Sequence, residues 1–209
     1  MLTIIYDNVV WNKALTPDWG FSCLVETPEQ TLLFDAGANG RILLENMKTL
    51  KLAPEMVDTV FISHAHWDHT GGLDDFLRLN PVHVFIPASC PVPPHAAKVT
   101  RVGSGVKIGE GLYSTGELGG IEQSLVIEKD ERAVVVAGCS HPGVDAILNA
   151  ASGIGKVAML IGGLHGFNDF HLIEDLDHIC PAHCTQYIEE IKHRYPDKYI
   201  AAGAGRIIY

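Results

Sequence analysis

The sequence contains no long hydrophobic run and comparatively few basic residues. No apolar stretch approaches the roughly 20 residues that a membrane-spanning helix needs, so we expect no membrane segment. Lys and Arg together number 15, against 25 Asp and Glu, and the formal net charge is −10. Surfaces that bind nucleic acid need clustered Lys and Arg. The charge balance therefore argues against a nucleic-acid partner.

An export signal and a disulfide framework are also missing from the sequence. Residues 1–6 read as a strand and lack the basic region and cleavage site of a signal peptide, so we expect a cytoplasmic location. The five cysteines are an odd number, and we expect reduced thiols or metal ligands rather than disulfides. The Gly-x-Ser-x-Gly turn of covalent hydrolases does not occur.

The length and the hydrophobic periodicity indicate the fold class. A chain of 209 residues with 47% hydrophobic residues suits one domain made of two packed halves, about 1–95 and 96–209. Strand-like and helix-like segments alternate, which predicts an α/β fold: an αββα sandwich of two mixed sheets with helices on the outer faces. The expected strands are 2–6, 21–26, 31–34, 57–62, 82–86, 109–113, 122–128, 133–137 and 157–161, with further strands or turns at 199–202 and 206–209. The expected helices are 39–50, 73–79, 144–151 and 184–194, and 87–99 reads as an irregular loop.

The segment 63–72 carries the densest chemical signal. His64, His66, Asp68 and His69 follow directly after an apolar run that reads as a buried strand. Imidazole and carboxylate groups are ligands for zinc, iron and manganese. One loop cannot wrap a single ion with all four groups. We therefore expect His64 and His66 to bind one ion while Asp68 and His69 turn toward a second.

Three later segments supply candidate partners for this loop. Each follows an apolar, strand-like run and ends in side chains that bind metals or move protons: Cys139 and His141, then His165, then His183. The ends of strands at one edge of a sheet converge. We therefore expect these side chains to share one cleft with the loop at 63–72.

The motifs together resemble a known family. The pattern His-x-His-x-Asp-His followed by two glycines is similar to the signature of the metallo-β-lactamase superfamily. The resemblance extends to a narrower group of small metal-dependent hydrolases labelled dihydropterin-methyl-ribofuranosylaminobenzene-phosphate synthase-like. The matching segments are 19–22, 68–73, 138–141, 162–165 and 181–185. The resemblance implies the metallo-β-lactamase fold and a site for one or two ions.

The resemblance also implies how the ligands divide. His64, His66 and His141 would form the first site, and Asp68, His69 and His183 the second, with Cys139 as a further candidate. In this family an aspartate at the position of Asp35 supports the metal loop by hydrogen bonding, although an aspartate at a strand end is also an ordinary turn former.

One segment departs from the family pattern. Members similar to glyoxalase II have a histidine before one strand and a bridging aspartate after it. Here the segment 119–124 has no histidine, and Cys139 stands near the place of the aspartate. We infer that His141 replaces the missing ligand from a shifted position. Cys139 is either a ligand, which would favour zinc, or a small buried thiol.

Several residues are open to two interpretations. His165 is an extra ligand, a proton donor, a substrate contact or a structural histidine. His183 lies just before the expected helix, so Thr185 or the N-terminal amides of that helix would meet an anionic group. Trp19 would stack on a substrate ring or pack in the core. We expect Cys180 and Cys184 to be packing residues, and His83, His95, His171, His178 and His193 to be structural or on the surface.

The sequence thus predicts a metal-dependent hydrolase. A metal-bound hydroxide would attack a small substrate, with an anionic phosphoester, a thioester or a lactone all open, and Asp68 would orient it or accept a proton. Zinc is the expected ion, with manganese or iron as alternatives. Two other classes stay open: an iron-dependent redox enzyme on the same fold, and a non-catalytic ligand-binding protein. Metal analysis and an absorption spectrum of the purified protein would separate them.

Overall fold

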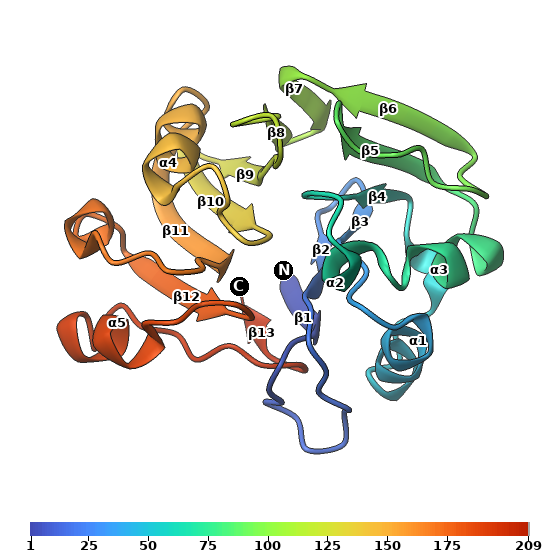
Figure 1. Cartoon of the computed structure of the whole chain (residues 1–209), viewed down its shortest axis with the longest axis horizontal. Coiled ribbons are helices and arrows are strands. Elements are labelled where there is room, and N and C mark those ends of the chain that lie inside the picture. Colours follow the sequence, from blue (N-terminus) through green and yellow to red (C-terminus); the bar gives the residue numbers. More distant parts are fainter. Residues whose placement is uncertain (209) are drawn as a thin grey trace.

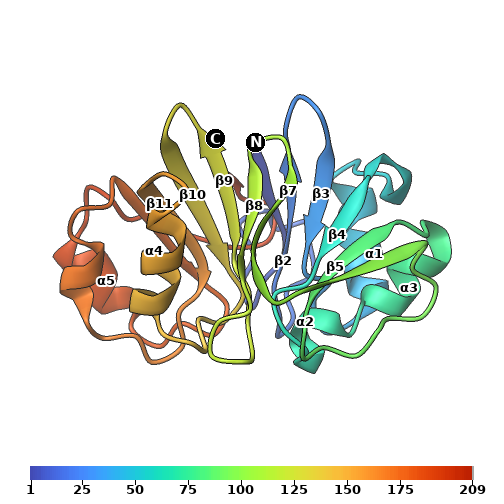
Figure 2. The same cartoon turned by 90° about the horizontal axis from the view of Figure 1, so that it is seen from above.

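The computed structural model describes residues 1–208 and contains two mixed β-sheets packed face to face, with helices on both outer faces (Figures 1 and 2). The sheet orders are β13-β1-β2-β3-β4-β5-β6 and β12-β11-β10-β9-β8-β7. The first sheet contains β1 Leu2–Tyr6, β2 Ser22–Glu26, β3 Thr31–Phe34, β4 Thr59–Phe61, β5 His83–Pro87, β6 Lys98–Val102 and β13 Ile207–Ile208. The second contains β7 Ser104–Gly109, β8 Leu112–Gly116, β9 Leu125–Lys129, β10 Arg132–Ala137, β11 Lys156–Gly163 and β12 His178–Ala182. The predicted sandwich is confirmed.

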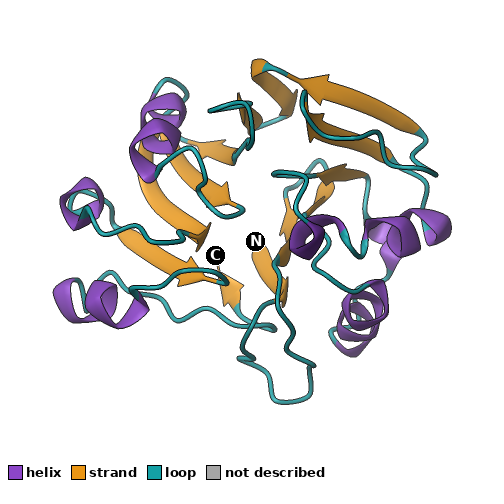
Figure 3. Ribbon diagram, viewed as in Figure 1, coloured by secondary structure: helices purple, strands orange, loops and turns teal. Residues whose placement is uncertain are grey.

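Short helices cover the outer faces of the sheets (Figure 3). They are α1 Gly40–Thr49, α3 Leu73–Leu79, α4 Val144–Ser152 and α5 Ile188–Arg194. The one-turn helix α2 Trp67–Thr70 belongs to the segment after β4, and 3₁₀ turns occur at η1 Pro54–Met56 and η2 Phe170–Ile173. The helix α1 begins where the Asn39 side chain accepts the backbone N–H groups of Arg41 and Ile42. Within residues 1–208, no helix has the length and apolar character needed to cross a membrane.

The core has three layers because the central strands are buried on both faces. In β3, Leu32 and Phe34 pack between the sheets, whereas Leu33 packs under α1 and α3. In β10, Val136 faces the other sheet and Val135 faces α4. Such strands read as continuous apolar runs rather than as alternating ones. That is why these central strands were predictable from the sequence.

The edge of the sandwich corrects several expectations. We expected an irregular loop at 87–99 and a strand at 109–113, and therefore did not predict β6 and β7. The reason is that β6 is an edge strand with polar residues and β7 is largely exposed. The first sheet extends beyond residue 95, since it includes β6 and β13. Tyr209, within the expected segment 206–209, lies outside the described residues.

Two further expectations need correction near the cleft. The expected helix at 184–194 begins only at Ile188, and residues 184–187 form a turn. The expected strand at 122–128 begins only at Leu125, and residues 122–124 are a buried connection. Both segments contact the candidate site, so their irregular backbone has a local reason.

Strand direction places the loops of both sheets at one cleft. In the first sheet β3, β4, β5 and β6 run parallel, and in the second β10, β11 and β12 run parallel. The segments that leave the carboxyl ends of these strands therefore meet at one side of each sheet. In Figure 1 the short helix α2 and the loop after β10 face each other across the centre of the molecule.

Candidate metal centre

Side chains that follow three strands meet in the cleft between the sheets. The loop after β4, the loop after β10 and the residue after β12 contribute donor atoms that lie within 4.8 Å of one another in overlapping groups. The structure thus brings together all the predicted ligands: His64, His66, Asp68, His69, Cys139, His141 and His183.

The first donor group consists of His64, His66 and His141. The Nε2 atom of His64 and the Nε2 atom of His141 each lie 3.1 Å from Nδ1 of His66. Ligands about 2.0–2.1 Å from a tetrahedral ion are separated by roughly 3.3 Å, so these three nitrogens already have nearly the required spacing. His66 is exposed, which leaves one side of the group open to solvent.

The second donor group consists of Asp68, His69 and His183. Asp68 Oδ2 lies 3.2 Å from Nε2 of His183 and 3.9 Å from Nε2 of His69. The Nε2 atom of His183 is buried and has no hydrogen-bond partner among the described residues. An unpartnered buried nitrogen is costly, and a bound cation would satisfy it. The donor set therefore fits a metal ion.

Asp35 sets the orientation of two of these imidazoles. Its carboxylate accepts three hydrogen bonds, each 2.7 Å long. The donors are the backbone N–H of Ser63, the hydroxyl of Ser63 and the Nδ1–H of His69. Because the Ser63 hydroxyl donates to Asp35, its oxygen is left to accept Nδ1–H of His64 at 2.9 Å. Both rings then present the Nε2 lone pair to the cleft, as metal ligation requires.

Asn8 orients His183 in the same way. The Asn8 Oδ1 atom accepts Nδ1–H of His183 at 3.0 Å, and the Asn8 amide donates to the backbone oxygen of His183 at 2.9 Å. Asn8 follows β1 and lies 175 residues from His183 in the sequence. The sequence interpretation did not identify this residue, because nothing in its neighbourhood signals the contact.

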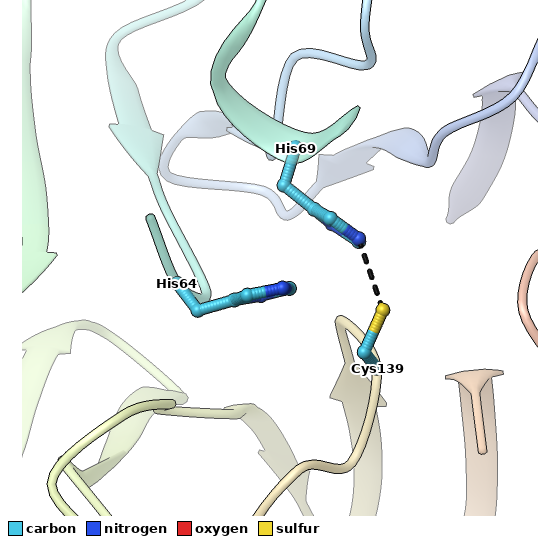
Figure 4. A group of neighbouring side chains, drawn as sticks. All are labelled: His64, His69 and Cys139. Atoms are coloured by element: carbon cyan, nitrogen blue, oxygen red, sulfur yellow. Dashed lines mark hydrogen bonds between the residues drawn. The ribbon is translucent and has the colours of Figure 1, made fainter. Parts of the chain in front are cut away.

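Cys139 extends the cluster with sulfur. Its Sγ atom lies 3.1 Å from Nε2 of His69 (Figure 4). The same atom lies 3.3 Å from Sγ of Cys184. Figure 4 shows His64 and His69 pointing toward Cys139 from across the cleft. Cys139 therefore lies where a ligand would be needed, and its role as one stays a prediction.

Glu122 is a second residue that the sequence interpretation missed. Its buried carboxylate accepts four backbone N–H groups over 2.9–3.1 Å, from Gly138, Cys139, Ser140 and His141. Burial raises the pKa of Glu122, and these hydrogen bonds oppose that rise. The carboxylate thus fixes the loop that carries two candidate ligands. An acidic residue between two glycines and a strand was the only available signal.

Three of the candidate histidine ligands have lowered pKa values. Burial, with repulsion from neighbouring imidazoles, lowers the pKa of His141 to about 4 and of His183 to about 3, and moves the pKa of His64 still lower. These rings are neutral near pH 7 and keep free lone pairs. Burial opposes protonation of His69 as well, but the charge and hydrogen bond of Asp35 raise the pKa of His69.

Backbone strain is concentrated around the cleft. Asp35, Ser140, His165 and His183 have φ values of 52°, 59°, 45° and 48°. Residues other than glycine seldom adopt this left-handed region, and such strain clusters at functional sites. Each of the four directly or nearly follows a strand whose carboxyl end faces the cleft.

Trp19 lies against two of the candidate ligands. Its indole N–H donates to Asp68 Oδ2 at 2.9 Å, and its ring meets His183 edge-on with centroids 5.1 Å apart. Trp19 is 49% exposed. The contact makes it a support for two candidate ligands, and stacking on a substrate stays a prediction for its outer face.

His165 and Thr185 have contrasting surroundings. The His165 ring lies 4.5 Å from the His141 ring and lines a cavity of about 660 Å³ with Val144, Phe167 and Leu172. Thr185 is buried, and its hydroxyl donates to the Ala182 oxygen at 2.7 Å and accepts the Leu164 N–H at 3.0 Å. The expectation that a helix begins beside Thr185 is wrong, so no helix terminus supports an anion there. The remaining histidines, His83, His95, His171, His178 and His193, belong to none of the donor groups found among residues 1–208.

Comparisons with known proteins agree with this geometry. A sequence profile described as Metallo-beta-lactamase superfamily matches residues 15–138. An uncharacterized protein of Methanocaldococcus jannaschii is 24% identical, with 100% of this chain and 99% of the relative covered. The 7,8-dihydropterin-6-methyl-4-(beta-D-ribofuranosyl)-aminobenzene-5'-phosphate synthase of the same organism is also 24% identical, with 99% and 95% covered. The crystal structure of Tm1679, described as a metal-dependent hydrolase of the beta-lactamase superfamily, has a TM-score of 0.81 at 23% identity, with 100% and 98% covered.

Proposed function

Because the chain belongs to the metallo-β-lactamase superfamily, we propose that it is a metal-dependent hydrolase of a small, anionic substrate. One observation carries this proposal. The two donor groups, drawn from both sheets, turn their lone pairs toward one cleft that opens beside a cavity of about 660 Å³. A cavity of this size suits a small molecule.

The donor chemistry indicates the ions. Imidazole and carboxylate accept zinc, manganese or iron, and a nearby thiol favours zinc. We propose two ions, one at each donor group. When bound, such ions lower the pKa of water to about 7 and polarise the oxygen of the bond that is attacked.

We propose that two side chains act on the substrate and its protons. One oxygen of Asp68 accepts the Trp19 N–H, and we assign this carboxylate the role of accepting a proton from the attacking water. His165 lies beside His141, and both line the cavity. We assign it contact with the leaving group. Its intermediate exposure lets it exchange protons with solvent.

The substrate class rests on the site and on the relatives. Neutral histidines and bound cations would attract an anionic group despite the acidic surface. One relative is named as a synthase whose product carries a phosphate ester. A phosphoester is therefore our first choice, with thioesters and lactones next.

A substrate panel tests the proposal. Protein loaded with Zn²⁺, Mn²⁺ or Fe²⁺ is assayed on phosphodiesters, phosphomonoesters, thioesters and lactones. We expect hydrolysis that a chelator abolishes and added metal restores. His66→Ala should remove activity, whereas His193→Ala, an exposed histidine on α5, should keep it. Full activity of the metal-free protein would overturn the proposal.

The nature of the attack can be tested separately. Under single-turnover conditions in ¹⁸O water, direct attack by water puts label in the first product. An unlabelled first product or a trapped covalent enzyme intermediate would contradict it. Asp68→Ala should lower kcat by several orders of magnitude in a folded protein, a barrier change of about 3–6 kcal/mol.

A further inference from the structure

Cys184, expected from the sequence to be a packing residue, has its sulfur at the edge of the candidate metal centre. Its Sγ atom lies 3.3 Å from Sγ of Cys139, which lies 3.1 Å from Nε2 of His69. Donor atoms of Cys139, His183 and Cys184 all lie within 4.8 Å of one another. The two thiols therefore share a space with the His183 imidazole, and His69 lies beside this space through its contact with Cys139.

The local backbone directs the Cys184 sulfur to this place. Cys184 follows His183, whose left-handed φ of 48° turns the chain as it leaves β12. Gly163, at the end of the neighbouring strand β11, provides the room. A Cβ atom there would lie 2.7 Å from Sγ of Cys184 and 3.2 Å from Cα of Cys139. Only a residue without a side chain leaves the two sulfurs together.

We propose that Cys184 is a metal ligand, which with Cys139, His69 and His183 forms an inner Cys₂His₂ position. This proposal rests on the proposed metal-dependent function. Cys₂His₂ is a donor set that holds zinc in four-coordinate sites. Cys139 is also nearer to His69 than Asp68 is, at 3.1 Å against 3.9 Å. The inner position is accordingly richer in sulfur than the first donor group, which is made of imidazoles alone.

The expected consequence is a difference in metal selectivity between the two positions. Thiolates select soft or borderline ions such as zinc, whereas manganese prefers carboxylate and water. The first donor group is open on its exposed side at His66, and the inner position is closed by buried residues. We expect the inner position to hold zinc more tightly than the first group, and Mn²⁺ to fail to replace zinc at the inner position.

Cobalt spectroscopy tests the ligand directly. The full-length protein, freshly reduced and free of oxygen, is titrated with Co²⁺, and thiolate-to-cobalt absorption in the near ultraviolet is recorded. Cys184→Ser should lose roughly half of the band and Cys139→Ser roughly the other half, since each removes one of two thiolates. Cys180→Ser is the matched control, because Cys180 is buried in β12 within the core between the sheets. A full band in Cys184→Ser would overturn the proposal.

X-ray absorption of the zinc-loaded wild-type protein gives an answer that does not depend on a variant that folds. Two sulfur neighbours at about 2.3 Å are expected for the inner zinc, which with two ions bound averages to one sulfur per zinc. One sulfur for two zinc ions would make Cys184 a packing residue and leave the proposed hydrolase intact. If Cys139 and Cys184 are joined by a disulfide in the zinc-loaded protein, neither sulfur can bind the ion as a thiolate. That result would also overturn the assignment of Cys184 as a ligand. A protein that binds no metal at all would overturn both proposals.

Discussion

His69 donates a 2.7 Å hydrogen bond to Asp35, and neither side chain is exposed to solvent. With no water to compete, this bond fixes which ring nitrogen faces the cleft. Asp35→Asn keeps the size of the side chain but turns an NH₂ group toward groups that already donate. We expect metal affinity to fall about 10- to 100-fold, measured by competition with a chelator.

The matched control for this change is Asp58→Asn. Asp58 also accepts a backbone N–H, that of Thr31 at 2.7 Å, but it lies on the surface. Metal affinity should stay at the wild-type value in this variant. Equal losses in both variants would mean that Asp35 acts through general stability rather than through His69.

Glu122 offers a test of how the loop at 138–141 is held. Glu122→Ala leaves three buried N–H groups and the partly buried N–H of His141 without acceptors. At about 1–3 kcal/mol for each buried group, the free energy of unfolding should fall by at least about 3 kcal/mol. Glu122→Gln keeps one oxygen and should lose less stability while weakening metal binding at His141. Urea unfolding and metal titration measure the two effects.

A surface glutamate provides the comparison for Glu122. The side chain of Glu128 accepts the Glu131 N–H at 3.0 Å on an exposed turn. Glu128→Gln should change neither stability nor metal binding measurably. If Glu122→Gln behaves like Glu128→Gln, the loop is held by its own backbone rather than by the carboxylate.

Trp19 can be tested for the two roles that its position allows. Trp19→Phe removes the hydrogen bond to Asp68 Oδ2 but keeps an aromatic face. If the hydrogen bond matters, kcat should fall roughly tenfold, which is about 1.4 kcal/mol, with little change in KM. If the ring stacks on substrate, Trp19→Phe should be mild and Trp19→Ala should raise KM.

Trp67→Phe is the reference for that experiment. Trp67 lies next to Asp68 in the metal loop at 63–70 and is 64% exposed. A similar loss of kcat in Trp67→Phe would point to disturbance of the loop and would remove the case for the Trp19 hydrogen bond.

The buried carboxyl group of Asp7 should make the free energy of unfolding depend on pH. Burial raises the pKa of Asp7 from 3.8 to about 6, so the folded state binds a proton more tightly than the unfolded state. Its stabilisation is therefore complete below pH 3.8 and is lost as pH rises through about 6. A shift of about two units corresponds to roughly 3 kcal/mol.

The measurement compares wild type with Asp7→Asn across pH 4 to 7, in metal-free protein unfolded by urea. The difference in unfolding free energy between them should decline as pH rises, because only the wild type loses the proton. The comparison cancels titration of the other groups that both proteins share. A constant difference would show that Asp7 has no raised pKa.

Removal of metal should destabilise the whole molecule. The donors come from both sheets, so an ion that binds only the folded state stabilises it by about 2.7 kcal/mol at 100 times its Kd. Chelation should lower Tm in a scanning experiment. In His66→Ala the chelator should have a smaller effect, and an unchanged Tm in wild type would contradict the ligand assignment.

The family and the fold were predictable because their signals are local. Four candidate donors fall within six residues after β4, so the sequence alone forces them together. The central strands are buried on both faces and read as apolar runs. The motif resemblance to the metallo-β-lactamase superfamily is confirmed by the profile over residues 15–138.

The supporting residues were not predictable because their partners are distant in the sequence. Asn8 reaches His183 across 175 residues and Glu122 reaches His141 across 19. Nothing about Cys184 distinguishes it from a packing thiol until Gly163 and Cys139 are seen beside it. The edge strands β6 and β7 were not predicted for a different reason: they are exposed, so their sequences lack the apolar pattern that indicates a buried strand.

Among residues 1–208, the cavity beside His165 is lined by residues within 140–145 and 164–172, in the segments that follow β10 and β11. The metal loop at 63–70 belongs to the other sheet. The cavity positions other than His141 and His165 therefore make up two short stretches that a combinatorial library can cover without altering any candidate ligand. Variants from such a library would differ in the substrate that they prefer, while all of them would keep the same candidate metal ligands and the same reaction.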